Sequence, residues 1–107
     1  MIQILISKHN DEYRQLQAFG HAEYDDYGKD IICSAVSVLI INTANSLEKF
    51  TGDLVLAETY EDGTTEILIK EHPSAEAVLL MDSLVLGLEG IQNQYGKKYL
   101  SVDYKEV

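Results

Sequence analysis

Apolar and polar residues alternate in the first twenty positions of the chain, and a period of two is typical of β-strands that bury one face. The alternation begins with Ile2, Ile4 and Ile6 and resumes over residues 14–20 after the polar turn KHNDE. A turn between two alternating runs predicts a β-hairpin. We therefore expect a hairpin whose second strand ends at Gly20.

The same pattern returns twice later in the chain. The runs DLVLAETY and TTEILIK, between residues 53 and 70, flank the turn sequence EDG at 61–63 and predict a second hairpin. A last alternating segment at 99–105 predicts a final strand.

Two longer segments repeat apolar residues every three or four positions, as amphipathic helices do. The first helix is expected from about Ile31 to Lys49. It carries two stripes, which are Ile32, Val36, Leu39, Ile40, Thr43 and Leu47 on one side, and Ser34, Val38, Ile41 and Asn45 on another. A helix with two usable faces is usually packed on both. We expect one face on the sheet and the other against a second helix or a second copy of the chain, which favours a homodimer.

The second helix is predicted to start at Pro73 and Ser74, because proline closes the preceding strand and serine supplies an N-cap oxygen. Gly87 and Gly90 are costly inside a helix and suggest close packing on the first helix. The resulting order, ββαββαβ, predicts a single domain over residues 1–107. We expect the α+β class, with two layers and two helices on one face of a mainly antiparallel sheet.

Candidate chemistry is concentrated just after the first hairpin, where His21 precedes the only cysteine, Cys33, by twelve residues. Cysteine thiols are mostly protonated at neutral pH, so a nucleophilic cysteine needs an imidazole or the positive end of a helix to lower its pKa. If Asp30 is the N-cap, residues 31–33 form the first helical turn, whose free N–H groups would also bind an oxyanion. The alternative is that Cys33 is a small buried apolar residue and His21 is incidental.

The stretch GHAEYDDYGKDIICSAVSVL resembles the signature of the ribosomal-processing cysteine protease family. In that family a Gly-His-Ala segment is followed by a Gly-x-Asp-Ile-Val-Cys-Ala-Ala-Val-Ser segment. The matching residues here are Gly20, His21, Ala22 and Tyr24, and then Gly28, Asp30, Ile31, Ile32, Cys33, Ala35, Val36 and Ser37. Weaker similarity covers the remainder of the chain, including a Gly-Leu-x-x-Ile segment at 87–91. Glu23, Ile32 and Ser34 depart from the family pattern without removing a reactive group.

The resemblance implies a cysteine endopeptidase that acts in ribosome maturation. Its substrate would be the protein numbered twenty-seven of the large ribosomal subunit, from which it removes an N-terminal extension. Carried over by position, Cys33 is the nucleophile and His21 is its base. Asp30 matches an acidic position of the motif. It orients His21, caps the helix or does both, and of these roles we favour capping. The alternative function is a non-catalytic module that binds a basic ribosomal polypeptide without cutting it.

A loop is expected from Ala22 to Lys29, between the histidine and the helix. Gly20 and Gly28 stand at its ends as hinges, and Tyr24 and Tyr27 would cover a bound peptide. Equally, the two tyrosines would only pack the loop down. The carboxylates of this loop are either solvated or contact a basic substrate tail; they are Glu23, Asp25 and Asp26.

The chain is acidic, with 18 Asp and Glu against 8 Lys and Arg residues and a formal charge of −10. Direct nucleic-acid binding is not expected, because phosphate contacts need a basic surface. The negative field would speed encounter with a basic polypeptide, or it only keeps a small protein soluble.

A single cysteine excludes an internal disulfide framework and fits a reducing cytosol, so we expect a cytoplasmic protein. We expect no signal peptide, because no basic segment precedes the first apolar run, and no stretch that spans a membrane. No ligand spacing predicts a metal and no motif predicts a cofactor. His9 and His72 are expected to be surface residues rather than ligands.

Overall fold

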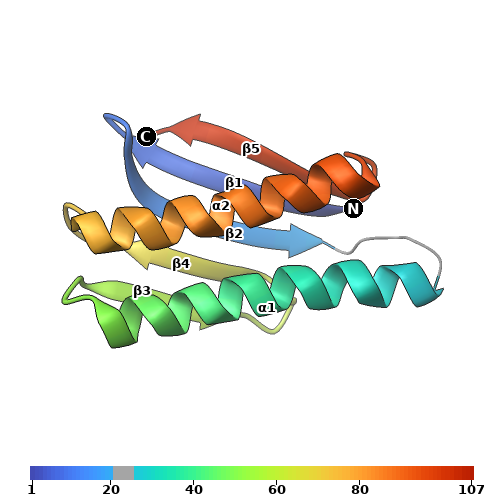
Figure 1. The fold of residues 1–107 in the computed structure, drawn as a ribbon, viewed down its shortest axis with the longest axis horizontal. Helices are drawn as coiled ribbons and strands as arrows, with labels where there is room; N and C mark the ends of the chain where they lie inside the picture. The colour runs from blue at the N-terminus through green and yellow to red at the C-terminus, as the bar shows by residue number, and fades with distance from the viewer. Residues whose placement is uncertain (21–25) are drawn as a thin grey trace.

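The computed structural model describes residues 1–20 and 26–107, and for residues 26–30 it describes the backbone only. The elements are β1 (Ile2–His9), β2 (Glu12–Gly20), α1 (Asp26–Phe50), β3 (Val55–Thr59), β4 (Thr65–Ile69), α2 (Ala75–Tyr95) and β5 (Leu100–Glu106). They form two layers, with both helices on one face of the sheet (Figure 1). The predicted order and the α+β class are confirmed.

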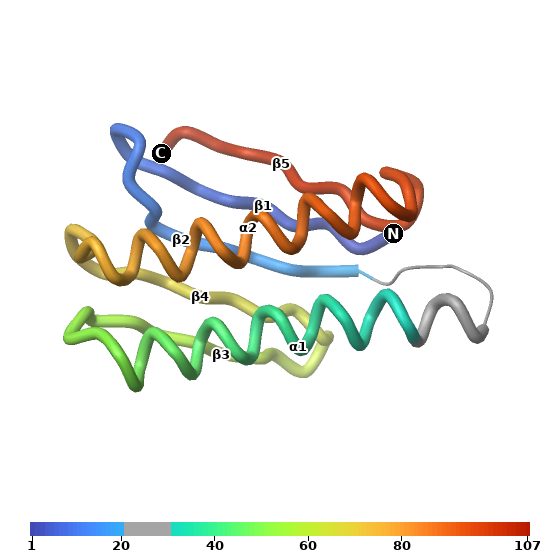
Figure 2. Tube along the Cα trace, viewed as in Figure 1, coloured from blue at the N-terminus to red at the C-terminus, as the bar shows by residue number. Residues whose placement is uncertain are grey.

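The sheet has five strands in the order β3-β4-β2-β1-β5. Three of its four strand pairs are antiparallel, whereas β5 runs parallel to β1. The first hairpin turns at Asn10 and Asp11, whose φ angles of 49° and 67° suit a two-residue turn. The tube view shows the two ends of the chain at opposite ends of the sheet (Figure 2).

The apolar face of α1 packs against the sheet as its spacing predicts. The buried residues recur along one stripe, which consists of Ile32, Val36, Ile40, Thr43 and Leu47. The second stripe is exposed in the single chain; it consists of Ser34, Val38, Ile41 and Asn45. The contact between α1 and α2 uses a different side of the helix, because Leu39 lies against Gly87.

The prediction of close helix packing at the two glycines is confirmed for Gly87 and wrong for Gly90. A Cβ atom at Gly87 would lie 3.0 Å from Leu39 Cδ1, so the missing side chain lets the helices approach. A Cβ atom at Gly90 would meet nothing within 4 Å. Packing therefore explains only the first of the two glycines.

The N-cap of α2 is also as predicted. Ser74 Oγ accepts a hydrogen bond of 3.1 Å from the Ala77 N–H. The carboxylate of Asp53 accepts bonds from the Ser74 N–H at 2.8 Å and from the Ser74 hydroxyl at 2.6 Å. The hydroxyl bond is the main reason that the pKa of Asp53 is lowered. The segment before β3 is thereby joined to the start of α2.

The start of α1 differs from the prediction. The helix begins at Asp26, five residues before Ile31, and ends at Phe50. Residues 26–29 therefore belong to the helix and not to the expected loop, and Asp30 lies inside the helix rather than at its N-cap. Several residues before Ile31 are of N-cap type, Asp25 and Asp26 among them, so the sequence offered more than one start.

We expected no stretch that could span a membrane, and this expectation is wrong if only the length and composition of α1 are considered. The segment Ile31–Phe50 has 20 residues and contains an 18-residue window with a mean hydropathy of 1.5, so it is long and apolar enough to cross a membrane. A single helix of this kind is weak evidence, since core helices pass the same test. The buried stripe of α1 is already used against the sheet, which accounts for much of its apolar character.

Candidate active site

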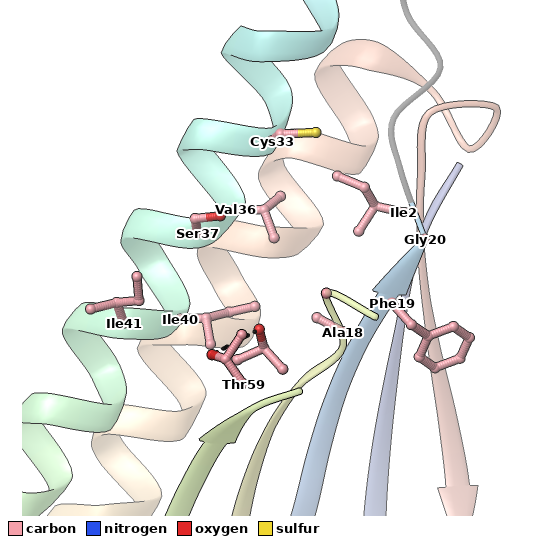
Figure 3. A pocket seen from close by; sticks show the side chains of 12 residues that line it. Ile2, Ala18, Phe19, Gly20, Cys33, Val36, Ser37, Ile40, Ile41 and Thr59 are labelled. Carbon is pink, nitrogen blue, oxygen red and sulfur yellow. Dashed lines mark hydrogen bonds between the residues drawn. The ribbon is translucent and has the colours of Figure 1, made fainter. Parts of the chain in front are cut away.

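Cys33 lies on the side of α1 that faces the end of β2. Its side chain is partly buried and packs against the apolar core, and the thiol is free. Figure 3 shows the sulfur directed from the helix toward Ile2 and Gly20. The thiol is thus held at the border between the core and the surface, where a substrate can reach it.

A cavity of about 300 Å³ opens beside Cys33. One wall is the helix, with Val36 and Ile40 next to the cysteine, and another is the end of β2 at Ala18 and Gly20. The β3–β4 hairpin closes a further side with Thr59, Gly63 and Thr65. Mostly apolar walls with a few polar atoms are typical of ligand pockets.

The hairpin side of this cavity was not predicted. The two threonine hydroxyls of Thr59 and Thr65 face each other at 3.5 Å across the strand pair. Close by, the Tyr60 hydroxyl donates to Glu66 at 2.9 Å, and this bond is the main cause that raises the pKa of Tyr60 to about 12. These residues come near the cysteine only because β4 pairs with β2. No local sequence motif predicts that pairing.

The predicted activation of Cys33 by the helix end is wrong. Because α1 begins at Asp26, Cys33 is the eighth residue of the helix and not part of its first turn. The N–H groups of residues 31–33 are used inside the helix, since only the first four N–H groups of a helix are free. They neither activate the thiol nor form an oxyanion hole. Other groups must therefore activate the thiol and stabilise the oxyanion.

Gly20 is the one predicted loop residue that the structure describes in full, and it faces the same cavity as Cys33. Its φ is 90°, and a Cβ atom there would overlap the carbonyl oxygen of Met1. Glycine is therefore required both by the backbone conformation and by the close approach of the first strand.

The remaining predicted residues are only partly described. His21 and Tyr24 lie outside the described residues, as do the other positions from 21 to 25. Tyr27, Gly28 and Asp30 belong to α1, but their side chains are not described. The predicted capping role of Asp30 and the predicted place of Gly28 at the end of a loop are wrong, because both residues lie inside α1. The roles of His21, Tyr24 and Tyr27, and the orienting role of Asp30, stay predictions.

The other two histidines lie at the surface, as expected. His9 Nδ1 is 2.7 Å from the Val107 carbonyl oxygen, and His72 contacts the carboxylate of Glu12. Within residues 1–20 and 26–107, no group of three or more His, Cys, Asp and Glu side chains is placed to hold a metal ion. The absence of a metal from the complete chain stays a prediction.

Comparison with known proteins also indicates cysteine chemistry. Residues 1–100 match the family model described as cysteine protease Prp. The chain belongs to the Prp cysteine protease family. Its enzyme class is therefore that of the cysteine proteases, as the sequence predicts.

Two Prp relatives cover most of the chain. The ribosomal processing cysteine protease Prp of Bacillus subtilis is 28% identical over 101 residues, which is 89% of this chain and 90% of the relative. The protein of the same name from Staphylococcus aureus is 26% identical over 88 residues, covering 80% and 81% of the two chains. These relatives are named as ribosomal processing proteases, which agrees with the predicted class of function.

Two solved Prp structures from S. aureus share the fold. The complex with a covalently linked product peptide has a TM-score of 0.87 at 24% identity, covering 98% of this chain and 100% of the other. The complex with a substrate peptide has a TM-score of 0.86 at 23% identity, with the same coverage. At this identity the likeness establishes the fold.

The close approach of Gly20 to Met1 yields a testable prediction. Gly63 has nearly the same φ, 89°, but a Cβ atom there meets nothing within 4 Å. We expect Gly63→Ala to cost roughly 1–3 kcal/mol of unfolding free energy from backbone strain alone. Gly20→Ala should cost more, because the added methyl must also displace the first strand. Urea unfolding of the two variants at pH 7 measures the difference, and equal losses would contradict the steric role of Met1.

Proposed function

We propose that this Prp family member removes the N-terminal extension of the protein numbered twenty-seven of the large ribosomal subunit, and so acts in ribosome maturation. The observation that carries the proposal is the placement of the Cys33 thiol at a 300 Å³ apolar cavity next to Gly20, the residue that directly precedes His21. The names of the two bacterial relatives support a ribosomal substrate.

The proposed chemistry uses the Cys33 thiol and the His21 imidazole. His21 takes the proton of the Cys33 thiol, and Sγ attacks the scissile carbonyl carbon. The C–N bond then breaks, the proton passes from His21 to the leaving amine, and the N-terminal fragment remains on Sγ as a thioester. A water molecule then gives a proton to His21 as its oxygen attacks the thioester carbon. The C–S bond breaks, the fragment leaves as an acid, and Sγ takes the proton back from His21. No cofactor is needed for either half of the reaction.

The sequence position of His21 supports the pairing of the two residues. His21 directly follows Gly20 in the sequence, and Gly20 is the last residue of β2. Gly20 and Cys33 line one cavity, and this supports the proposal that the residue after Gly20 acts with the thiol. In this proposal Asp30 orients His21, since its capping role is removed by the observed start of α1.

The charge of the chain suits the proposed substrate. A formal charge of −10 attracts the basic N-terminal segment of a ribosomal protein and repels nucleic acid. We also propose that the enzyme works in the cytoplasm, where a single unpaired cysteine stays reduced.

Removal of the thiol tests the proposal most simply. We expect Cys33→Ala and Cys33→Ser to abolish cleavage, because neither side chain supplies a thiolate, while both proteins stay folded. The measurement is the mass of the ribosomal protein after incubation, which reports its new N-terminus. Ser37→Ala is the matched control, since Ser37 lines the same cavity and lies one helical turn from Cys33; it should retain cleavage within a few-fold. Cleavage by pure Cys33→Ala would contradict the protease function.

We further propose that the enzyme is a homodimer that packs through the outer face of its helix layer. Two large apolar side chains are exposed there, Val38 on α1 at 65% and Leu86 on α2 at 73%. They lie at the same level of the layer, because each precedes one partner of the Leu39–Gly87 contact. Large exposed apolar side chains on two neighbouring helices favour association.

A charge placed in this surface should separate the subunits. Leu86→Glu is expected to give a monomer in light scattering at a concentration where the native protein is a dimer. The matched control is Leu54→Glu, because Leu54 is also an exposed leucine, at 55%, but precedes β3 outside the helix layer. The idea fails if the native protein is monomeric or if both variants remain dimeric.

A further inference from the structure

The end of β2 extends beyond the end of its pairing with β4. On the β1 side, pairing continues to the last residue of β2, where Ile2 is opposite Gly20. On the β4 side, the last pair is Ala18 with Thr65. Phe19 and Gly20 therefore have a strand partner on one side and, among the described strands, none on the other. The unpaired edge of a strand is a template for another extended chain.

The direction of the backbone groups at this edge follows from the strand pairing. The Ile2 N–H donates to Tyr99 on the β5 side at 2.9 Å, so the next residue of β1, Gln3, directs its groups to β2. Gln3 is opposite Phe19, whose carbonyl therefore faces β1. Because the peptide group is planar and trans, the N–H of Gly20 points the opposite way, toward the side that β4 leaves open.

The cavity lies directly beneath this edge, on the helix side of the sheet. Figure 3 shows Phe19 on the far face of the sheet, while Ala18 points toward the helix side where Val36 and Ile40 lie. The small side chain of Ala18 leaves the floor of the cavity open. A volume of about 300 Å³ is that of roughly ten water molecules, which gives room for one large side chain.

An added strand would use both features together. Successive side chains of a strand point to opposite faces, so a chain laid along Phe19 and Gly20 directs every second side chain toward the cavity. Cys33 forms part of the cavity wall, and its sulfur is directed to the end of β2. A peptide bound here would bring a backbone carbonyl to the thiol.

We propose that the substrate binds as a short additional strand beside Phe19 and Gly20, and that it places one bulky apolar side chain, from a residue next to the cut, in the cavity above Ala18. This inference rests on the proposed protease function. It describes how the site would select its peptide. The occupant is an extended, basic polypeptide. The hairpin beside the cavity carries carboxylates at Glu58, Glu61 and Asp62, which suit a positively charged continuation of that chain.

The side-chain part of the proposal is tested with peptides that span the cut of the ribosomal extension. Each position near the cut is replaced in turn by Gly, Leu or Phe, and kcat/KM is measured for the native enzyme and for Ala18→Leu. At one position the native enzyme should prefer the bulky residue over Gly by at least tenfold. Ala18→Leu should lower kcat/KM at least tenfold for the bulky peptide while sparing the Gly peptide. Ala57→Leu, a substitution on exposed β3 outside this cavity, should leave the preference unchanged.

The backbone part is tested on the native enzyme, so that it does not depend on the folding of any variant. Single N-methyl groups are placed on successive amides of the best peptide. Strand addition predicts losses in kcat/KM of at least tenfold at alternate amides and little effect at the amides between them, since alternate N–H groups face β2.

The outcomes separate this proposal from the function on which it rests. If the native enzyme cleaves none of these peptides or the ribosomal protein itself, the proposed function fails and the binding mode fails with it. If it cleaves them without an alternating pattern, or if Ala18→Leu affects bulky and Gly peptides equally, the binding mode is overturned while the protease function stands.

Discussion

The site depends on one close contact, between Met1 just before β1 and Gly20 at the end of β2. At Gly20 the backbone must adopt a φ of 90°, and the carbonyl of Met1 fills the space that a side chain would need. This contact holds the end of β2 against the start of the chain. Because α1 packs on the same sheet, the end of β2 also becomes one wall of the cavity that Cys33 lines.

The helix layer holds the other half of the site in place. The buried stripe of α1 on the sheet and the Leu39–Gly87 contact with α2 fix the rotation of α1 about its axis. Cys33 lies one residue after the fully buried Ile32, so its sulfur can reach the edge of the core but not the open solvent face. Partial burial suits a nucleophile, which must be accessible to one carbonyl and shielded from bulk water.

The order of elements could be predicted because each rests on a local signal. Alternation at Ile2, Ile4 and Ile6 and the Ser74 cap are examples, and the structure bears out both. The start of α1 could not be predicted, because Asp25 and Asp30 are both residues of N-cap type and the local sequence does not choose between them. The parallel pairing of β5 with β1 and the register of β4 on β2 depend on contacts distant in sequence. The cavity and its hairpin wall were missed for that reason, since a shift of register would have removed them.

The central claim is that Cys33 and His21 act together on a bound peptide. A peptide that ends in a chloromethyl ketone, built on the sequence preceding the cut, tests it directly, because the chain has a single cysteine and fragment masses locate the adduct. The account predicts one adduct on Cys33, formed much faster than with a scrambled peptide and slowed about a hundredfold or more in His21→Ala. Labelling no faster than with the scrambled peptide, or unchanged by His21→Ala, would contradict the account.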